Sequence, residues 1–463
     1  MNIVPRPATP DTFSRIMDSP RQTVSVRSAN GEALWRFLRA IVIGILLIRS
    51  ASDPVFNILG GEASASAMGV GAIFNIVAIA IAFVFFAQQP LTASFSVVGI
   101  WGPFLLIAFG ATLYAPDFVA AARLALVLLS YWSFFVIPFF IWRSPSDVSR
   151  FVLIVMASSV IPSLYAFVDI ARGISDMADF RLQSTFSHPN IYAFYLVLLL
   201  GLALYVRSSR VVRVTSQIRM LITLYIPVLA AFLMLTKTRS AWITFALIFL
   251  VYAFKIDRRF LAGFFLVPFL LVADPSLVDR LTDVTAASEV DDFSQLNDSN
   301  RLNSYVWREA LWESAIPSIM EKPILGHGLE SFKPSMASFF PLIGPEGIDG
   351  HNFYLQMAFE MGLLGVIALV WLLGSVARQV AKGWRHDPDG IVVVLCILTA
   401  YALESYSDNM HFYLSFNWYF WFAMGTICAW VYNIEKMPSP ARTGESPCAR
   451  RLRTHERHRP RLV

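Results

Sequence analysis

The fold is decided by residues 323–366, which read PILGHGLESFKPSMASFFPLIGPEGIDGHNFYLQMAFEMGLLGV. This stretch begins with a turn between Gly326 and Gly328 and crosses a segment rich in proline and glycine. It ends with His351 and Asn352, directly before a long apolar run. Because such a run is typical of a transmembrane helix, the stretch predicts a polar, histidine-bearing loop at the mouth of one.

The composition of the chain indicates a membrane protein. Its 463 residues are 56% hydrophobic and only 15% charged, whereas about a quarter of the residues in a soluble domain are charged. Apolar runs recur along most of the length, and backbone groups in lipid must pair internally, so such runs form helices. We therefore predict an all-α, polytopic integral membrane protein.

Twelve apolar runs are candidate transmembrane spans. They cover approximately 35–50, 69–87, 95–114, 120–141, 151–171, 190–206, 220–236, 240–256, 259–273, 352–376, 391–411 and 413–433. This divides the chain into a disordered tail (1–34), nine spans (35–273), a loop domain (274–351), three spans (352–433) and a basic tail (434–463). Within the loop domain, residues 301–321 predict an amphipathic helix, with Trp307 and Trp312 at the membrane interface.

The charges of the loops separate into two faces. Basic residues gather after the sixth, eighth and tenth spans and in the C-terminal tail, whereas the segment 274–350 carries 13 acids against five basic residues. Because basic loops stay in the cytoplasm, we expect both tails there and 274–350 outside, as one large periplasmic loop. The net charge of +5 is spread over these short loops and tails, so it does not indicate a nucleic-acid partner.

Polar side chains gather where the predicted spans reach the outer face. They are Arg123 near the start of span four, His188 and Asn190 at the start of span six, Lys237 and Arg239 before span eight, His351 and Asn352 at the start of span ten, and Glu404, Asp408 and His411 at the end of span eleven. Asn, Ser and Pro are also ordinary residues at a helix start. Yet helix N-termini attract anions, and guanidinium groups bind phosphate oxygens. The pattern therefore favours a strongly anionic ligand, such as a diphosphate.

His351 is the candidate proton acceptor among these residues. Imidazole is near-neutral at working pH and can accept a hydroxyl proton, although a lone histidine at a helix start is more often a cap or a packing residue. The sequence contains no metal-ligand spacing, Walker loop or dinucleotide loop. We therefore expect chemistry without a metal or a cofactor.

The chain resembles the O-antigen ligase and polymerase family of bacterial inner-membrane proteins. The resemblance covers most of residues 120–433 and includes a large outer loop between spans nine and ten. In sequence it rests on SHPNIYAFYL (187–196), LTKTRSAW (235–242), the run from Arg301 through Trp307 and Ala310, PILGHGLESF (323–332) and HNFYLQMAFEMGLLG (351–365).

This resemblance implies transfer of a glycan from a polyprenyl diphosphate carrier to an acceptor sugar, outside the cytoplasmic membrane. It implies that Arg239 and Arg301 hold the diphosphate, while His351 activates or orients the acceptor hydroxyl. The further expected substrate-binding residues are Lys237, Arg123, His188, Asn190, Asn352 and Asp408. The expected partners are the polyprenyl diphosphate-linked oligosaccharide, a glycan or lipid-linked acceptor, membrane lipids and a chain-length regulator.

Three functions stay open on the sequence. A polymerase of exopolysaccharide or O-antigen repeats, which we favour, uses a second lipid-linked repeat as its acceptor, whereas an O-antigen ligase uses lipid A-core. The alternative of another class is a flippase for lipid-linked oligosaccharides. Transporters place polar sites at the midplane of the membrane and often show repeats, whereas the polar residues here collect at one face.

Overall fold

The computed structural model describes residues 29–55, 70–89, 95–142, 144–173, 180–266, 304–340 and 347–436. The regular elements in these ranges are all helical. They are α2 (Ala29–Arg49), α4 (Val70–Gln88), α5 (Phe95–Thr112), α6 (Phe118–Ile141), α7 (Ser146–Ala157), α8 (Val160–Gly173), α9 (Pro189–Ser208), α10 (Ser216–Leu235), α11 (Arg239–Lys255), η3 (Arg258–Leu266), α14 (Ser304–Glu321), α15 (Phe332–Phe339), α16 (Phe353–Ala381), η5 (Lys382–Arg385), α17 (Pro388–Ser407), η6 (Met410–Phe412) and α18 (Leu414–Glu435).

Several of these helices can cross a membrane. Six segments of the described chain are long and apolar enough to do so: Phe118–Ile141, Ser146–Gly173, Pro189–Ser208, Ser216–Leu235, Phe353–Arg385 and Pro388–Ser407. The predicted all-helical membrane class is thereby confirmed. Twelve spans and a periplasmic loop stay predictions.

Most predicted spans coincide with helices whose bounds differ by a few residues. The fifth is divided into α7 and α8 by a turn at Ser158 and Ser159. The ninth contains only the short 3-10 helix η3 before the chain leaves the described residues. Residues 267–303, which include Arg301 and much of the predicted outer loop, also lie outside them. At the N-terminal end, α2 begins at Ala29, inside the range predicted as a tail.

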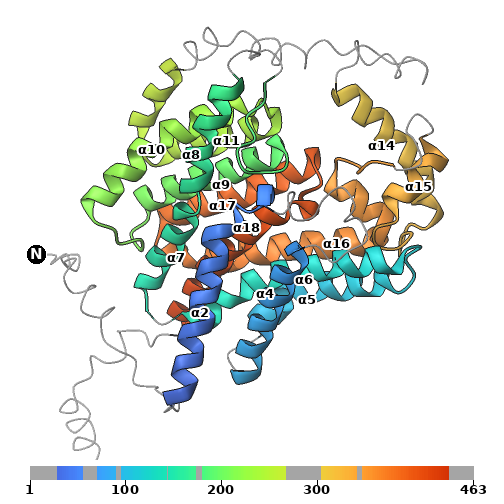
Figure 1. The fold of residues 1–463 in the computed structure, drawn as a ribbon, viewed down its shortest axis with the longest axis horizontal. Helices are drawn as coiled ribbons and strands as arrows, with labels where there is room; N and C mark the ends of the chain where they lie inside the picture. Colours follow the sequence, from blue (N-terminus) through green and yellow to red (C-terminus); the bar gives the residue numbers. More distant parts are fainter. Residues whose placement is uncertain are drawn as a thin grey trace, which may run out of the picture.

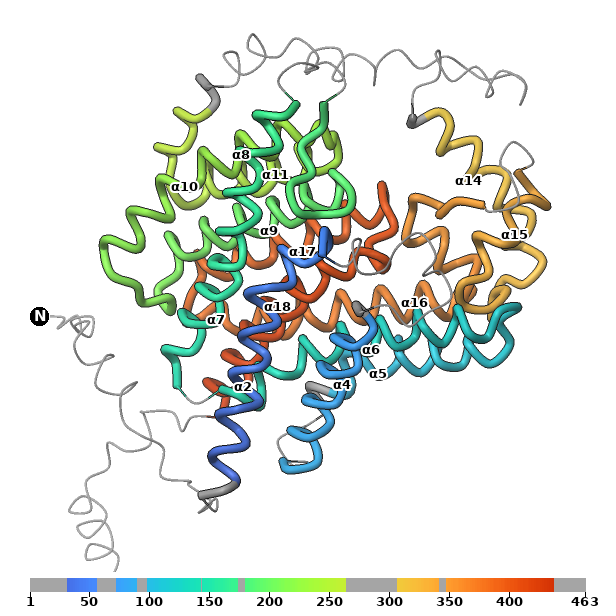
Figure 2. The backbone as a smooth tube through the Cα atoms, in the orientation of Figure 1, coloured from blue at the N-terminus to red at the C-terminus, as the bar shows by residue number. Residues whose placement is uncertain are grey.

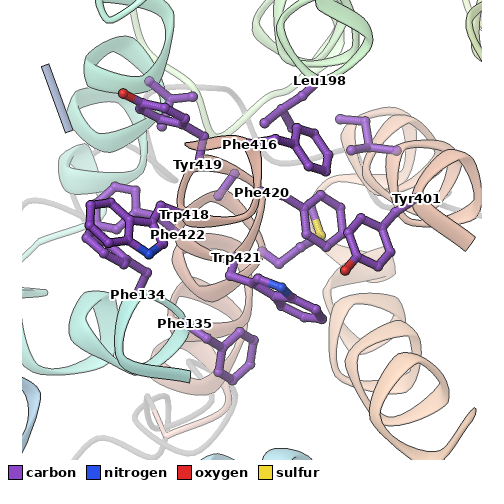
Figure 3. Packing of buried hydrophobic residues seen from close by; sticks show 14 of the residues in the cluster. Phe134, Phe135, Leu198, Tyr401, Phe416, Trp418, Tyr419, Phe420, Trp421 and Phe422 are labelled. Carbon is purple, nitrogen blue, oxygen red and sulfur yellow. The ribbon is translucent and has the colours of Figure 1, made fainter. Parts of the chain in front are cut away.

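The core of the molecule surrounds α18, whose residues from Ser415 to Tyr432 are all buried. A helix that is apolar all round belongs in an interior. Figure 3 shows its aromatic side chains between α6 and α17. The ring of Phe420 stacks on Tyr401 of α17 with 4.1 Å between centroids. A Cβ on Gly425 would lie 2.1 Å from the carbonyl oxygen of Phe135, so this glycine permits the close approach of α18 to α6.

α16 is broken at Gly362, where φ is 63° and ψ is −162°. The break frees two carbonyls and two N–H groups of the helix, and the loop Pro323–Gly328, which we call the clasp, pairs with all four. The bonds run from His327 N to Phe359 O (2.9 Å), from Gly328 N to Glu360 O (2.9 Å), from Leu363 N to Pro323 O (2.8 Å) and from Leu364 N to Ile324 O (3.3 Å). Because unpaired backbone groups are costly in lipid, the clasp makes the break tolerable.

Glycine is required on both sides of this junction. Gly326 and Gly328 have φ of 72° and 102°, in the left-handed region that favours glycine. A Cβ on Gly326 would lie 2.5 Å from the carbonyl carbon of Glu360, and one on Gly362 would lie 2.3 Å from the carbonyl oxygen of Ile324. The glycine turn read in the sequence therefore serves to bring two backbones together.

A second, smaller core joins α14, α15 and the part of α16 before the break. It contains Leu311, Ala315, Phe332, Met336, Phe340 and Phe359. Figure 1 shows α14 and α15 together beside one end of α16, and Figure 2 shows that α8 and α10 lie on the opposite side of the molecule. Trp307, predicted at the membrane interface, packs edge-on against Phe340. Trp312 likewise faces the protein, donating from Nε1 to Gly350 O at 2.7 Å.

Candidate functional site

The site lies where helix ends meet. His188, Thr238 and Asn352 are the N-cap residues of α9, α11 and α16, and Asp408 is the C-cap of α17. Hydrogen bonds and one ion pair join these ends, as described below. The three helix N-termini that the sequence pointed to are therefore brought together around a carboxylate, and each contributes partial positive charge.

Asp408 is the centre of the polar network. Its side chain is buried, and Oδ2 accepts a hydrogen bond from Asn190 Nδ2 at 2.7 Å. Oδ1 accepts from the backbone N–H of Asn409 at 3.0 Å and from the hydroxyl of Tyr413. The same oxygen lies 3.5 Å from Nδ1 of His351. Both oxygens of this buried carboxylate thus have partners, as buried polar groups require.

The surroundings of Asp408 favour its charged form. Burial by itself would raise the pKa of this carboxyl. The hydrogen bond and charge of His351, the hydroxyl of Tyr413 and the charge of Arg308 act in the opposite direction and bring the pKa below its ordinary value. The carboxylate is therefore ionised at neutral pH and attracts a proton on the Nδ1 side of His351.

His351 is held in an unusual backbone conformation beside this carboxylate. Its φ is 47°, in the left-handed region that few residues other than glycine occupy, and such conformations concentrate at functional sites. One third of its side chain is exposed. An imidazole whose Nδ1 proton faces a carboxylate presents Nε2 as a proton acceptor. The geometry is thus that of a partly accessible base with a carboxylate behind it.

Arg181, which the sequence reading did not select, orders the other side of Asp408. Its Nη2 donates to Oδ1 of Asn190 at 2.8 Å, and its Nε donates to the carbonyl of Thr236 at 3.0 Å. Thr238 Oγ1 also donates to Oδ1 of Asn190, at 3.2 Å. With its amide oxygen held by two donors, Asn190 directs its NH₂ group to Asp408. Arg172 and Arg181 are the basic residues between spans five and six, on the predicted outer face, where basic residues are uncommon, and this is the signal that could have identified Arg181.

Arg308 brings a second positive charge from α14. Its Nη1 donates to the carbonyl oxygen of Ser407 at 2.7 Å, at the end of α17. Its charge also helps to lower the pKa of both Asp408 and His188. Arg308 is one of the five basic residues of the segment 274–350, whereas the predicted arginine of this segment, Arg301, lies outside the described residues.

The predicted residues at the two neighbouring helix starts also lie at this site. Nδ1 of His188 accepts from the backbone N–H of Asn190 at 3.1 Å. Burial, followed by the charge of Arg181, lowers the pKa of His188. Lys237 is buried in the turn before α11 with a left-handed φ of 51°, and the half-buried Arg239 is the first residue of α11.

Two predicted residues have other surroundings. Oδ1 of Asn352 accepts from the backbone N–H of Leu355 at 3.1 Å, so its side chain caps α16. Arg123 is exposed near the start of α6. No hydrogen bond or ion pair joins Arg123 to the site within the part of the chain that the structure describes.

A polar chain continues from the site to the clasp. Asn409 Nδ2 donates to Oε1 of Gln356, which also accepts from Gly350 N at 3.2 Å. Gln356 Nε2 donates to Oε1 of Glu360 at 2.8 Å, and the backbone N–H of Glu330 donates to Oε2 of Glu360 at 3.0 Å. Burial, followed by the charge of Asp349, raises the pKa of Glu330 to about 7. Site and clasp are therefore connected by side chains as well as by backbone.

Residues 224–370 match the family model described as O-Antigen ligase. This segment is similar to the O-antigen ligase family. The predicted resemblance is thereby confirmed. The O-antigen ligase segment contains Arg239, Arg308, His351 and the clasp, whereas Asn190 and Asp408 reach the site from outside it.

A Rickettsia conorii protein named as a putative polysaccharide ligase is also similar to this chain. It is 27% identical over 134 residues, which make up 27% of this chain and 30% of the relative. The match with that relative thus spans about a third of its length. The name of this relative and the description of the family model both refer to a ligase.

Proposed function

We propose that the protein transfers a glycan from a polyprenyl diphosphate carrier to a hydroxyl of an acceptor sugar, at the periplasmic face of the bacterial inner membrane. The observation that carries the proposal is the pair of His351 and Asp408 at a junction of helix N-termini, with Arg308 beside it. The pair offers a proton acceptor, and the helix ends and the arginine offer positive charge for a diphosphate.

The proton leaves the acceptor through His351 in this proposal. The acceptor hydroxyl oxygen attacks the anomeric carbon of the donor sugar while its proton passes to Nε2 of His351. The bond between the anomeric carbon and the diphosphate oxygen breaks, and the polyprenyl diphosphate leaves with the electron pair. Asp408 stabilises the imidazolium that forms, because its carboxylate lies 3.5 Å from Nδ1.

The leaving diphosphate needs positive charge, which this site has in several places. One N–H group of Arg308 bonds to the carbonyl of Ser407, and a guanidinium has five, so further donors can serve phosphate oxygens. Arg239 and Lys237 at the start of α11 are the next candidates, and the family resemblance adds Arg301. Charge neutralisation by fixed donors is an effective way to stabilise a leaving group, so we propose a reaction without a metal.

We further propose that the acceptor is a second lipid-linked repeat, which makes the protein a polymerase working with a chain-length regulator. The test is glycan analysis in a deletion strain that carries wild-type or variant protein. Without the protein, a polymerase strain makes a single repeat on its final acceptor, whereas a ligase strain retains long chains on the carrier lipid. Either result supports glycan transfer, and the second assigns the protein as a ligase.

His351→Ala should insert normally and abolish long-chain polysaccharide. The control is His386→Ala, because His386 is exposed between η5 and α17, at the opposite end of α17 from Asp408. Normal levels of long chains with His351→Ala would contradict the proposal, as would equal losses in both variants.

A further inference from the structure

The exposed face of α14 changes from charged to apolar along the helix. Glu309 and Glu313 are exposed in its first half. Large apolar residues are exposed further along: Ile316 (52%), Met320 (67%), Ile324 (61%) and Leu325 (56%), which we call the apolar face. The two charged residues exposed among them, Glu321 and Lys322, lie next to each other between Met320 and Ile324. Contiguous exposed apolar residues of this kind mark an interaction surface.

The clasp fixes the depth of the apolar face relative to the membrane. Pro323 and Ile324 accept hydrogen bonds from Leu363 and Leu364, directly after the break in α16. From Leu363 to Arg385 the helical segment is about 35 Å long, which is enough to cross a hydrocarbon core of about 30 Å. The break therefore lies at one boundary of the membrane, and the basic end of the segment lies at the other.

A second membrane element gives the same depth. The hydroxyl of Tyr114 donates to the carbonyl of Leu325, and Leu329 N donates to Ala111 O at 3.3 Å. These contacts lie at the end of α5 and in the turn that leads to α6, a helix long and apolar enough to cross the membrane. Tyrosine is enriched at membrane interfaces. Two independent elements thus place the clasp at a membrane boundary.

We infer that the apolar face is inserted into the outer leaflet, where its partner is the acyl region of the lipids. The face continues into Leu363 and Ile367 of α16, which are exposed on a membrane-crossing segment and so contact lipid. Lys322, exposed between Met320 and Ile324, is suited to reach the headgroup phosphates. Glu309 and Glu313, on the first half of α14, remain in water.

Insertion would fix the distance between α14 and the lipid surface. One end of α14 is tied to the end of α17 by Arg308, and the other end enters the clasp. A lipid-linked diphosphate also lies at the level of the headgroups, so the helix would hold Arg308 at the level of that ligand. This consequence rests on the proposed function, whereas the insertion itself does not.

The test is a measurement of nitroxide accessibility in the full-length protein, in vesicles of phosphatidylethanolamine and phosphatidylglycerol. The three cysteines, Cys396, Cys428 and Cys448, are replaced by alanine. Single cysteines are then introduced as Met320→Cys and Leu325→Cys, with Glu309→Cys as the control in water and Ile367→Cys as the control in lipid. We expect the labels at 320 and 325 to collide several-fold more often with oxygen than with a water-soluble nickel complex, as the label at 367 does.

Two results would overturn the inference. Nickel collisions as frequent at 320 and 325 as at 309 would place the apolar face in water. Low collision rates with both reagents would mean that protein covers it. Neither result depends on glycan transfer, so a failure of this inference is distinguishable from a failure of the proposed function.

Discussion

At the scale of single residues, Asp408 determines how His351 can act. We predict that Asp408→Asn lowers the rate of glycan transfer by about 10²–10⁴-fold, the contribution of a positioned proton transfer, because the amide cannot stabilise the imidazolium. The measurement is product formation by purified protein with lipid-linked donor. The control is Asp389→Asn, the same change at the other end of α17, on a side chain that is 42% exposed. A rate equal to that of Asp389→Asn would remove Asp408 from the mechanism.

Tyr413 allows a subtler test of the same carboxylate. Its hydroxyl donates to Asp408 and helps to lower the pKa of that carboxyl. Tyr413→Phe removes only this donor, so the pKa of Asp408 should rise. Because activity is lost as the carboxylate is protonated at falling pH, the acidic limb of the pH–rate profile should move to higher pH. The rate at neutral pH should change little, and an unmoved limb would contradict the prediction.

Glu330 should make the stability of the protein depend on pH. Its pKa of about 7 in the fold, against 4.5 for an ordinary glutamate, means that the folded protein holds a proton that the unfolded chain releases. Stability therefore falls as the pH rises from about 4.5 to 7, by at most about 3 kcal/mol. Glu330→Gln should remove this loss, giving a higher unfolding temperature than wild type at pH 8 but not at pH 4.5. The same difference from wild type at both pH values would contradict the prediction.

At the scale of elements, the break in α16 is the most sensitive point. Gly362→Ala would force a Cβ against Ile324 in a backbone region that is essentially restricted to glycine. We expect a loss of about 1–3 kcal/mol from strain, and more if the clasp opens. Gly374→Ala in the same helix is the matched control, because a Cβ there meets nothing within 4 Å. Thermal unfolding of both variants in detergent checks this, and equal midpoints would argue against the clasp.

Local signals predicted the helix ends but not their partners. The starts of α9, α11 and α16 were readable because cap residues such as Asn352 are local features. The break at Gly362 was not readable, because the apolar run passes through it and the partner segment lies far away in sequence. Arg181 and Arg308 were missed for a related reason: which basic residues bond to the neighbours of Asp408 depends on how α14 and the segment before α9 fold over the helix ends.

At the scale of the whole molecule, the hydropathy of the chain was sufficient for the membrane class, and the charge pattern still predicts its orientation. A cysteine placed by Ser294→Cys should react with a membrane-impermeant maleimide in intact spheroplasts, whereas Cys448 in the basic tail should react only after lysis. The other two cysteines are replaced by alanine for this labelling. The reverse pattern would invert the topology and exclude a periplasmic site.

The clasp also sets an order of events during synthesis. Pro323–Gly328 is made before α16, yet its backbone partners lie within that helix. The loop must therefore wait until α16 has been made before the two can meet. Until they do, four backbone groups at the membrane boundary lack their final partners, and such groups are costly there. Closure of the clasp is therefore a late step in the formation of the fold, because it has to wait for α16.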